Sequence, residues 1–358
     1  MLEIFKKWYV RYLSEEESVL LLVLVLVSLM LLATIGDVLA PLLAALVMAF
    51  LVQGMVNILC RLGMPPWLGF SVAFTAFIGV FFAVLLGLLP LVWRQFLGLL
   101  AEFPRMVDQG REFLEVLPAR YPEVFTSGQV NQLLAGLQRE IAILGQTAVT
   151  KTLAGITGFL TVLVYVVLVP IIVFFLLKDR EQVTSWISNF FPTRRPLLNR
   201  IWDEMSIQFS NYARGKMVEI IIVGAASYVS FTGMGLRYAA LLGLLVGLSV
   251  IIPYIGAFIV TIPVAAVAMF QWGVSSEFYW VLAVYIVIQM LDGNVLVPLL
   301  FSEAVNLHPV AIIVAVLFFG GIWGLWGVFF AIPLATLIKA VINAWPTREA
   351  IAIPDSAE

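Results

Sequence analysis

The sequence predicts an all-α polytopic membrane protein with about eight transmembrane segments and a small helical extramembrane region. Of its 358 residues, 62% are hydrophobic and only 12% are charged, whereas soluble domains are about half apolar and about a quarter charged. The apolar residues also form long unbroken runs. Lipid offers the backbone no hydrogen-bond partner, so runs of this kind cross a bilayer as helices, while a β-barrel would need short alternating segments.

The N-terminal part of the chain predicts three membrane helices. Residues 19–35 form the first apolar run, and a tight break follows at Gly36. Residues 38–60 form the second run, and the third starts near Trp67 and extends beyond Trp93. Each run is long enough to span the hydrocarbon core as a helix of about 20 residues.

The character of the sequence changes after the third run. Residues 94–150 mix acidic and basic side chains but keep one apolar helical face around residues 130–144, which predicts amphipathic helices outside the bilayer core. The region is either a helical connector at the pore rim or a partner-binding arm. A fourth span follows at 151–177 and stops at Lys178, where a basic stretch begins.

Two C-terminal segments are too long for simple spans. Residues 236–272 are interrupted by a Pro253-Tyr-Ile-Gly motif, and residues 309–345 by the glycine cluster at 320–327, with an ordinary span at 278–300 between them. Each long segment is either a kinked single span or a re-entrant hairpin. The glycines also fit the small-residue spacing of closely packed helices.

Short loops rich in Lys and Arg orient a membrane protein toward the cytoplasm. Basic residues near both ends of the chain therefore predict cytoplasmic N- and C-termini and a periplasmic 94–150 region, in a multi-pass inner-membrane protein. The predicted divisions are transmembrane helices 1–3 (1–93), the extramembrane region (94–150), helix 4 (151–177), a basic cytoplasmic loop (178–211), a C-terminal transmembrane core (212–345) and a cytoplasmic tail (346–358).

The sequence lacks the residues that several enzyme classes require. There is no phosphate-binding G-x-x-x-x-G-K-[ST] loop for ATP hydrolysis and no G-x-S-x-G nucleophile motif. His308 is the only histidine and Cys60 the only cysteine, so a zinc site has no ligand set. A net charge of −2 gives no basic excess for nucleic acid. We expect no enzyme activity, no cofactor and no metal; transport or channel function remains.

The interruption at Pro253, Tyr254 and Gly256 is the first candidate for a substrate pathway. Proline removes a helical hydrogen bond, and irregular backbone at membrane depth is tolerated only against protein or a water-filled cavity. Interrupted helices in two parts of a chain point to a transporter binding site. The alternative is a kink without a direct role.

Four polar or helix-breaking residues of the 278–300 span extend this candidate pathway: Gln289, Asp292, Asn294 and Pro298. A carboxylate at membrane depth is costly and is usually functional, so Asp292 is predicted to bind a proton, a cation or the solute. Gln289 lies three residues earlier on the same helical face. The alternative is an interfacial carboxylate that caps a helix end.

Arg214, Lys216 and Glu219 lie at the start of the fifth span. We expect Glu219 to form an ion pair with Lys216 or Arg214 at the cytoplasmic boundary. The alternative is a functional role, in which these residues act as a gate or as a proton acceptor.

Several motifs, in order along nearly the whole chain, resemble the AI-2E transporter family. They are Pro170–Arg180, Asn211-Tyr-Ala-Arg-Gly-Lys216, Ile252-Pro-Tyr-Ile-Gly256, Asp292-Gly-Asn-Val-Leu-Val-Pro298, Leu307-His-Pro309 and Ala331-Ile-Pro-Leu334.

The resemblance implies a bacterial inner-membrane transporter of about eight spans that assembles as a homo-oligomer, by family likeness a pentamer. It further implies export of an autoinducer-2-like solute or coupling to H⁺ or Na⁺. The residues and the resemblance together predict a secondary transporter that moves a small solute through the lipid bilayer without ATP. The rivals are an oligomeric channel and a membrane scaffold that binds partners through its extramembrane region.

Overall fold

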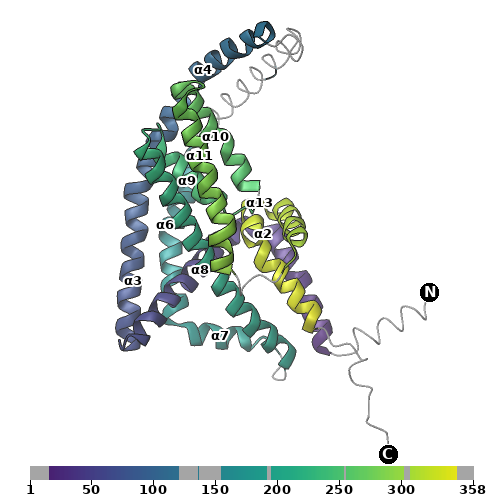
Figure 1. Cartoon of the computed structure of the whole chain (residues 1–358). Helices are drawn as coiled ribbons and strands as arrows, with labels where there is room; N and C mark the ends of the chain where they lie inside the picture. Colours follow the sequence, from purple (N-terminus) through teal and green to yellow (C-terminus); the bar gives the residue numbers. More distant parts are fainter. Residues whose placement is uncertain are drawn as a thin grey trace, which may run out of the picture.

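The computed structural model describes residues 16–120, 136, 155–191, 195–253, 255–301 and 307–344. Every secondary-structure element in these ranges is a helix, which confirms the predicted all-α membrane fold. Six described helices are long and apolar enough to cross a membrane, and the bent pair α6–α7 makes a seventh. Figure 1 shows most of the long helices running side by side, with α3 (Pro66–Ala83) at one edge of the view and α13 (Pro309–Ala344) toward the other.

The N-terminal helices follow the predicted order. Helix α2 (Glu16–Arg61) contains the first two predicted spans, and its helical geometry is interrupted at Ile35, next to the predicted break. Helix α3 (Pro66–Ala83) continues through a π-helical turn, η1 (Val84–Leu88), into α4 (Leu89–Arg120). The helix therefore does not end where the charged region begins at residue 94 but continues to residue 120; most of the remaining predicted region, from 121 to 150, lies outside the described residues.

The middle of the chain forms three helices. Helix α6 (Gly155–Lys178) is the fourth span and ends at the expected lysine. Helix α7 (Arg180–Ser188) leaves it at an angle of 82°, and α8 (Pro196–Gly233) then contains the fifth span. The 178–211 segment predicted as a loop is therefore helical over most of its length, because α8 begins at Pro196, about six turns before the apolar part of the span at Met217.

The first long segment is a re-entrant hairpin, which resolves the choice left open by the sequence. Its arms are α9 (Ala239–Ser249) and α10 (Ile255–Trp272). The 11 residues of α9 reach only about 16 Å, well short of the roughly 30 Å of a bilayer core. Residues of the two arms share one apolar core.

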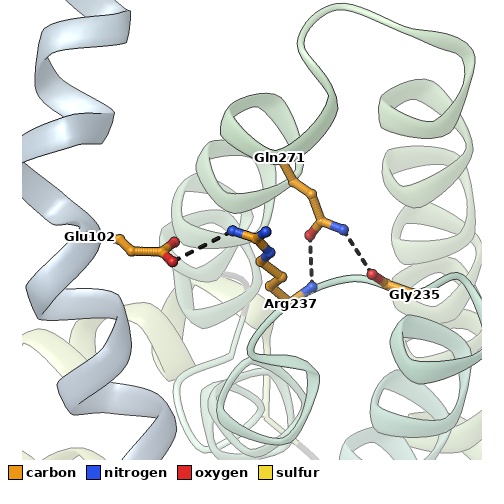
Figure 2. Close-up of polar contacts among 4 residues, drawn as sticks. All are labelled: Glu102, Gly235, Arg237 and Gln271. Atoms are coloured by element: carbon orange, nitrogen blue, oxygen red, sulfur yellow. Dashed lines mark hydrogen bonds and ion pairs between the residues drawn. The ribbon is translucent and has the colours of Figure 1, made fainter.

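The two ends of this hairpin are joined by a single side chain. Gln271 accepts a hydrogen bond from the Arg237 amide (2.7 Å) and donates one to the Gly235 carbonyl (2.8 Å), as Figure 2 shows. The Arg237 guanidinium also contacts Glu102 of α4 at 3.5 Å. The segment therefore returns to the side from which it entered, and its mouth is attached to the long α4 helix.

The next segment is a single span, as predicted, but its helix is interrupted by a π-helical turn. Helix α11 (Ser276–Leu291) passes through a π-helical turn, η2 (Asp292–Leu296), into the short α12 (Val297–Phe301). The Ser275 side chain caps the start of α11 by accepting the Phe278 amide hydrogen, a common way to satisfy a free amide at a helix N-terminus.

The second long segment, α13 (Pro309–Ala344), is also folded back on itself. Its helical geometry fails at Trp323 and Gly324, where Gly324 has a φ of 56° that favours glycine. A side chain at Gly327 would collide with the Phe319 carbonyl. Residues eight apart in a straight helix are about 12 Å apart, so this contact requires a hairpin. The indole of Trp323 at its tip fills the space beside Gly36 at the α2 break.

Close helix packing at glycines, the alternative considered for these clusters, is confirmed at Gly243 and Gly247. An added Cβ would lie 2.8 Å from Tyr228 at the first position and 2.8 Å from the Ile220 carbonyl at the second. Both neighbours belong to α8, so the first hairpin packs backbone to backbone against the fifth span. This packing brings the hairpin tip to the middle of α8.

Candidate functional site

The centre of the candidate site is a buried ion pair on α8. Lys216 Nζ lies 2.7 Å from Glu219 Oε2, and the two side chains are only 5% and 2% exposed. The residues are three apart, so they lie on one face of the helix. Burial of two charges is costly unless they are paired and hydrogen-bonded, so their surroundings must supply further polar contacts.

The tip of the first hairpin supplies one such contact. Lys216 Nζ donates a hydrogen bond to the Val250 carbonyl at 2.9 Å. Val250 caps the C-terminal end of α9, where helix carbonyls lack intrahelical partners and carry partial negative charge. A side chain at Gly256 would collide with the Ser249 carbonyl, so this glycine permits the tight turn that presents the carbonyl to Lys216.

The π-helical turn η2 supplies a second carboxylate. Asp292 is 7% exposed and close enough to interact electrostatically with Lys216 and with Glu219. Its Oδ1 has no hydrogen-bond partner among the described residues. We call Lys216, Glu219 and Asp292 the buried charge cluster. A π-turn displaces side chains from regular helical positions and is frequent at functional sites.

A polar face of α11 leads to this cluster. Tyr285, Gln289 and Asp292 are spaced four and three residues apart, so they lie on one side of the span. The Tyr285 hydroxyl donates to the Ala257 carbonyl of the first hairpin at 2.6 Å and accepts from Thr261 at 3.3 Å. Gln289 has a buried Nε2 without a hydrogen-bond partner in the described structure.

The second hairpin contacts the same part of α8. The Tyr212 hydroxyl donates to the Phe329 carbonyl at 3.0 Å. The ring of Phe301 lies 5.1 Å from Lys216 Nζ and forms an apolar wall beside the cluster. At the tip of the first hairpin, Ile252 packs against the apolar core between the arms of the second. Both hairpins therefore meet α8 within two turns of the buried charge cluster.

The structure brings some of the predicted residues together and separates others. Lys216, Glu219 and Asp292 are all buried, and Gln289 precedes Asp292 by three residues on the same helical face. Gly256 lies beside Ser249, next to the Val250 carbonyl that Lys216 binds, and Pro253 is half-buried at the same hairpin tip. Arg214 is exposed and instead donates to Ser210 Oγ at 2.8 Å, so the predicted pairing of Glu219 is with Lys216.

Two further predicted residues do not join this group. Asn294 and Pro298 are exposed, and the Asn294 amide donates to the Met290 carbonyl at 2.8 Å. Tyr254 lies outside the described residues.

Sequence reasoning missed Tyr212, Tyr285, Phe301 and the Val250 carbonyl. Tyr212 could have been predicted from the sequence, because it lies in the same six-residue motif, Asn211–Lys216, as Lys216. Tyr285 was signalled by its spacing of four residues from Gln289. The Val250 carbonyl carries no side-chain signal at all.

The charges of the cluster do not balance. With all three groups ionised, one ammonium faces two carboxylates and a carbonyl dipole, leaving one uncompensated negative charge in a buried site. Such a charge is costly away from water unless a further positive charge compensates it. No group of three metal-ligating residues occurs in the described part of the chain.

Comparisons with known proteins agree with this architecture. The profile of the AI-2E family transporter matches residues 20–347. The chain belongs to the AI-2E transporter family. It is 46% identical over 346 residues to PerM of Escherichia coli (strain K12), which is named as a permease, and the match covers 97% of this chain and 98% of PerM. The family resemblance inferred from the motifs is thus confirmed.

More distant relatives are also named for transport. YueF of Bacillus subtilis (strain 168), named as a transport protein, is 25% identical over 305 residues, covering 84% of this chain and 82% of YueF. The AI-2 transport protein TqsA of Escherichia coli (strain K12) is 23% identical over 320 residues, with 89% of each chain covered. This member of the AI-2E family is therefore a multi-pass membrane transporter.

Proposed function

We propose that this family member is a secondary transporter that moves a small solute by alternating access between the two hairpin tips. The observation that supports the proposal is the convergence of the first hairpin tip, the π-turn of α11 and the second hairpin on one stretch of α8. Interrupted helices that meet at a buried charged group are the arrangement expected of a transporter binding site.

The charge imbalance of the cluster supports coupling to an ion. When a proton or Na⁺ enters, it neutralises the surplus carboxylate, and Lys216 keeps its contact with the Val250 carbonyl. When the ion leaves, Lys216 is the only cation for both carboxylates. The contacts that hold the hairpin tip therefore differ between the ion-bound and the ion-free state. Because of this difference, the ion binds one conformation more tightly than the other and shifts the equilibrium between them.

Several finer features belong to the same proposal. The name of TqsA supports an autoinducer-2-like solute as the first candidate. The basic segments support an inner-membrane protein with cytoplasmic termini, so the first hairpin enters from the periplasmic side and the second from the cytoplasmic side. The many exposed apolar side chains of the spans support contact with lipid and with further copies, by family likeness in a pentamer.

Proteoliposome counterflow tests the proposal. Vesicles loaded with autoinducer-2 or another small candidate solute should take up labelled solute in exchange, and uptake should saturate; linear uptake would instead support a channel. A pH or Na⁺ gradient should drive accumulation against the solute gradient.

The variant Asp292→Asn keeps the side-chain volume and removes the charge that the coupling ion neutralises. We expect gradient-driven accumulation to fall at least tenfold, while exchange between equal solute concentrations continues. The matched control is Asn294→Ala, an exposed residue of the same π-turn, which should leave both unchanged. Unaltered accumulation in Asp292→Asn would remove this carboxylate from the coupling mechanism.

A further inference from the structure

Helix α7 turns sharply away from the direction of the span that precedes it. It begins two residues after the membrane helix α6 ends at Lys178, and the two axes meet at 82°. The turn occurs at Asp179, whose backbone (φ −105°, ψ 26°) leaves the helical region. Because α6 crosses the bilayer, a helix perpendicular to its end extends along the membrane surface; Figure 1 shows α7 lying across the ends of the long helices.

The side chains of α7 are segregated into two faces. Val183, Trp186, Ile187 and Phe190 follow the spacing of one helical stripe, continued past the last helical residue. Trp186 is 64% and Phe190 71% exposed, and their rings form an edge-to-face pair at 5.0 Å. The opposite face carries Glu181, Ser185 and Ser188. The apolar face of α7 is therefore exposed and does not pack against the core of the protein.

Contacts at the end of α7 keep this stripe in place. Arg195 Nη1 donates to the Ser188 carbonyl at 2.7 Å, which satisfies a free carbonyl in the last turn. The same guanidinium lies 5.5 Å from the centre of the Phe191 ring. At the other end, the Lys178 ammonium lies 5.4 Å from the Phe174 ring. The C-terminal end of the helix is therefore held by Arg195, and cationic groups flank the apolar stripe at both ends.

We propose that α7 is an interfacial helix whose Val183–Phe190 face is inserted between the headgroups and acyl chains of the bilayer. Its place at the end of a membrane span puts it at this depth, and its composition fits: a short amphipathic helix with Trp and Phe on the apolar face and basic residues at its ends. The anchor holds the connection between α6 and α8, so it fixes the level at which α8, which bears Lys216, enters the membrane.

Site-directed spin labelling of the reconstituted full chain tests the proposal. In a Cys60→Ala background, which removes the single cysteine, I187C and V183C would carry a nitroxide on the apolar face and S185C would carry one on the polar face. The vesicles are phosphatidylethanolamine mixed with phosphatidylglycerol. Relaxation by oxygen, which is enriched in lipid, is compared with relaxation by a water-soluble nickel chelate.

The expected result is oxygen-dominated relaxation at positions 187 and 183 and nickel-dominated relaxation at 185. Nickel access at all three positions would overturn the proposal by placing α7 in water. Shielding of 187 and 183 from both reagents, with spin–spin broadening, would also overturn it by showing that another copy of the chain covers this face. The readout is independent of transport, so it stands or falls separately from the proposed function.

Discussion

The buried Lys216–Glu219 pair can be tested by a double-mutant cycle with Lys216→Met and Glu219→Gln. Lys216→Met removes the ammonium that contacts Glu219 at 2.7 Å and Val250 at 2.9 Å, and it leaves two carboxylates facing each other. Removing one partner of a buried pair typically costs about 3–5 kcal/mol. Glu219→Gln should cost less, about 1–3 kcal/mol, because Lys216 keeps its hydrogen bond to the Val250 carbonyl.

The double variant decides the interpretation. Replacing both partners of a buried pair is often nearly neutral, so Lys216→Met/Glu219→Gln should be more stable than Lys216→Met alone. We expect a coupling energy of roughly 2 kcal/mol or more, measured by equilibrium unfolding of the protein in bicelles. The control cycle joins Arg214→Met with Ser210→Ala, an exposed contact at 2.8 Å, whose coupling should stay below about 1 kcal/mol.

If the losses of unfolding free energy in the two single variants add up to the loss in the double variant within about 0.5 kcal/mol, Lys216 and Glu219 do not interact. The buried charge cluster would then not exist as an electrostatic unit, and the coupling mechanism built on it would fail. If the Lys216–Glu219 coupling energy is large but the variants still exchange solute, the pair stabilises the protein without being required for transport.

Three further predictions concern the hairpins. Gly256→Ala should destabilise the protein by about 1–3 kcal/mol, because the new methyl group collides with the Ser249 carbonyl, whereas Gly233→Ala, which meets nothing, should be neutral or slightly stabilising in the same thermal assay. Gln271→Ala removes both hydrogen bonds at the hairpin mouth, so hydrogen exchange at residues 235–241 should accelerate about tenfold; exchange like that of the unmodified protein would mean that the mouth is held by packing alone. If both long segments are re-entrant, an impermeant maleimide added to intact cells should label S275C but not H308C in a Cys60→Ala background, and the reverse pattern would indicate kinked spans.

Much of the architecture was predictable because a bilayer leaves a chain few choices. Each long apolar run is helical in the described structure, and the helices are interrupted near the predicted breaks, at Ile35, at residues 250–253 and at Gly324. The π-helical turn at Asp292 is a further interruption, in a span that was expected to be ordinary. The hairpins were not decided by these signals. A proline or glycine break has the same composition whether the chain then continues across the membrane or returns, and only contacts such as Gln271 with Gly235 distinguish the two.

The candidate site shows the same division. Sequence reasoning selected Asp292, Lys216 and Glu219 because ionisable groups are rare in apolar segments, but it also selected Arg214 and Asn294. Two residues along a helix are about 200° apart around its axis, so Arg214 faces outward when Lys216 faces inward. Which of the two faces inward depends on where the neighbouring helices pack.

The sequence by itself determined that this chain crosses a membrane as interrupted helices and carries charge at depth, because hydrophobicity and backbone hydrogen bonding are properties of each segment alone. Only the tertiary structure decided that two of the interrupted segments turn back, and that the Val250 carbonyl meets the Lys216–Glu219 pair. This contact joins residues 34 positions apart, and its geometry depends on the close packing of α9 on α8 rather than on any local pattern.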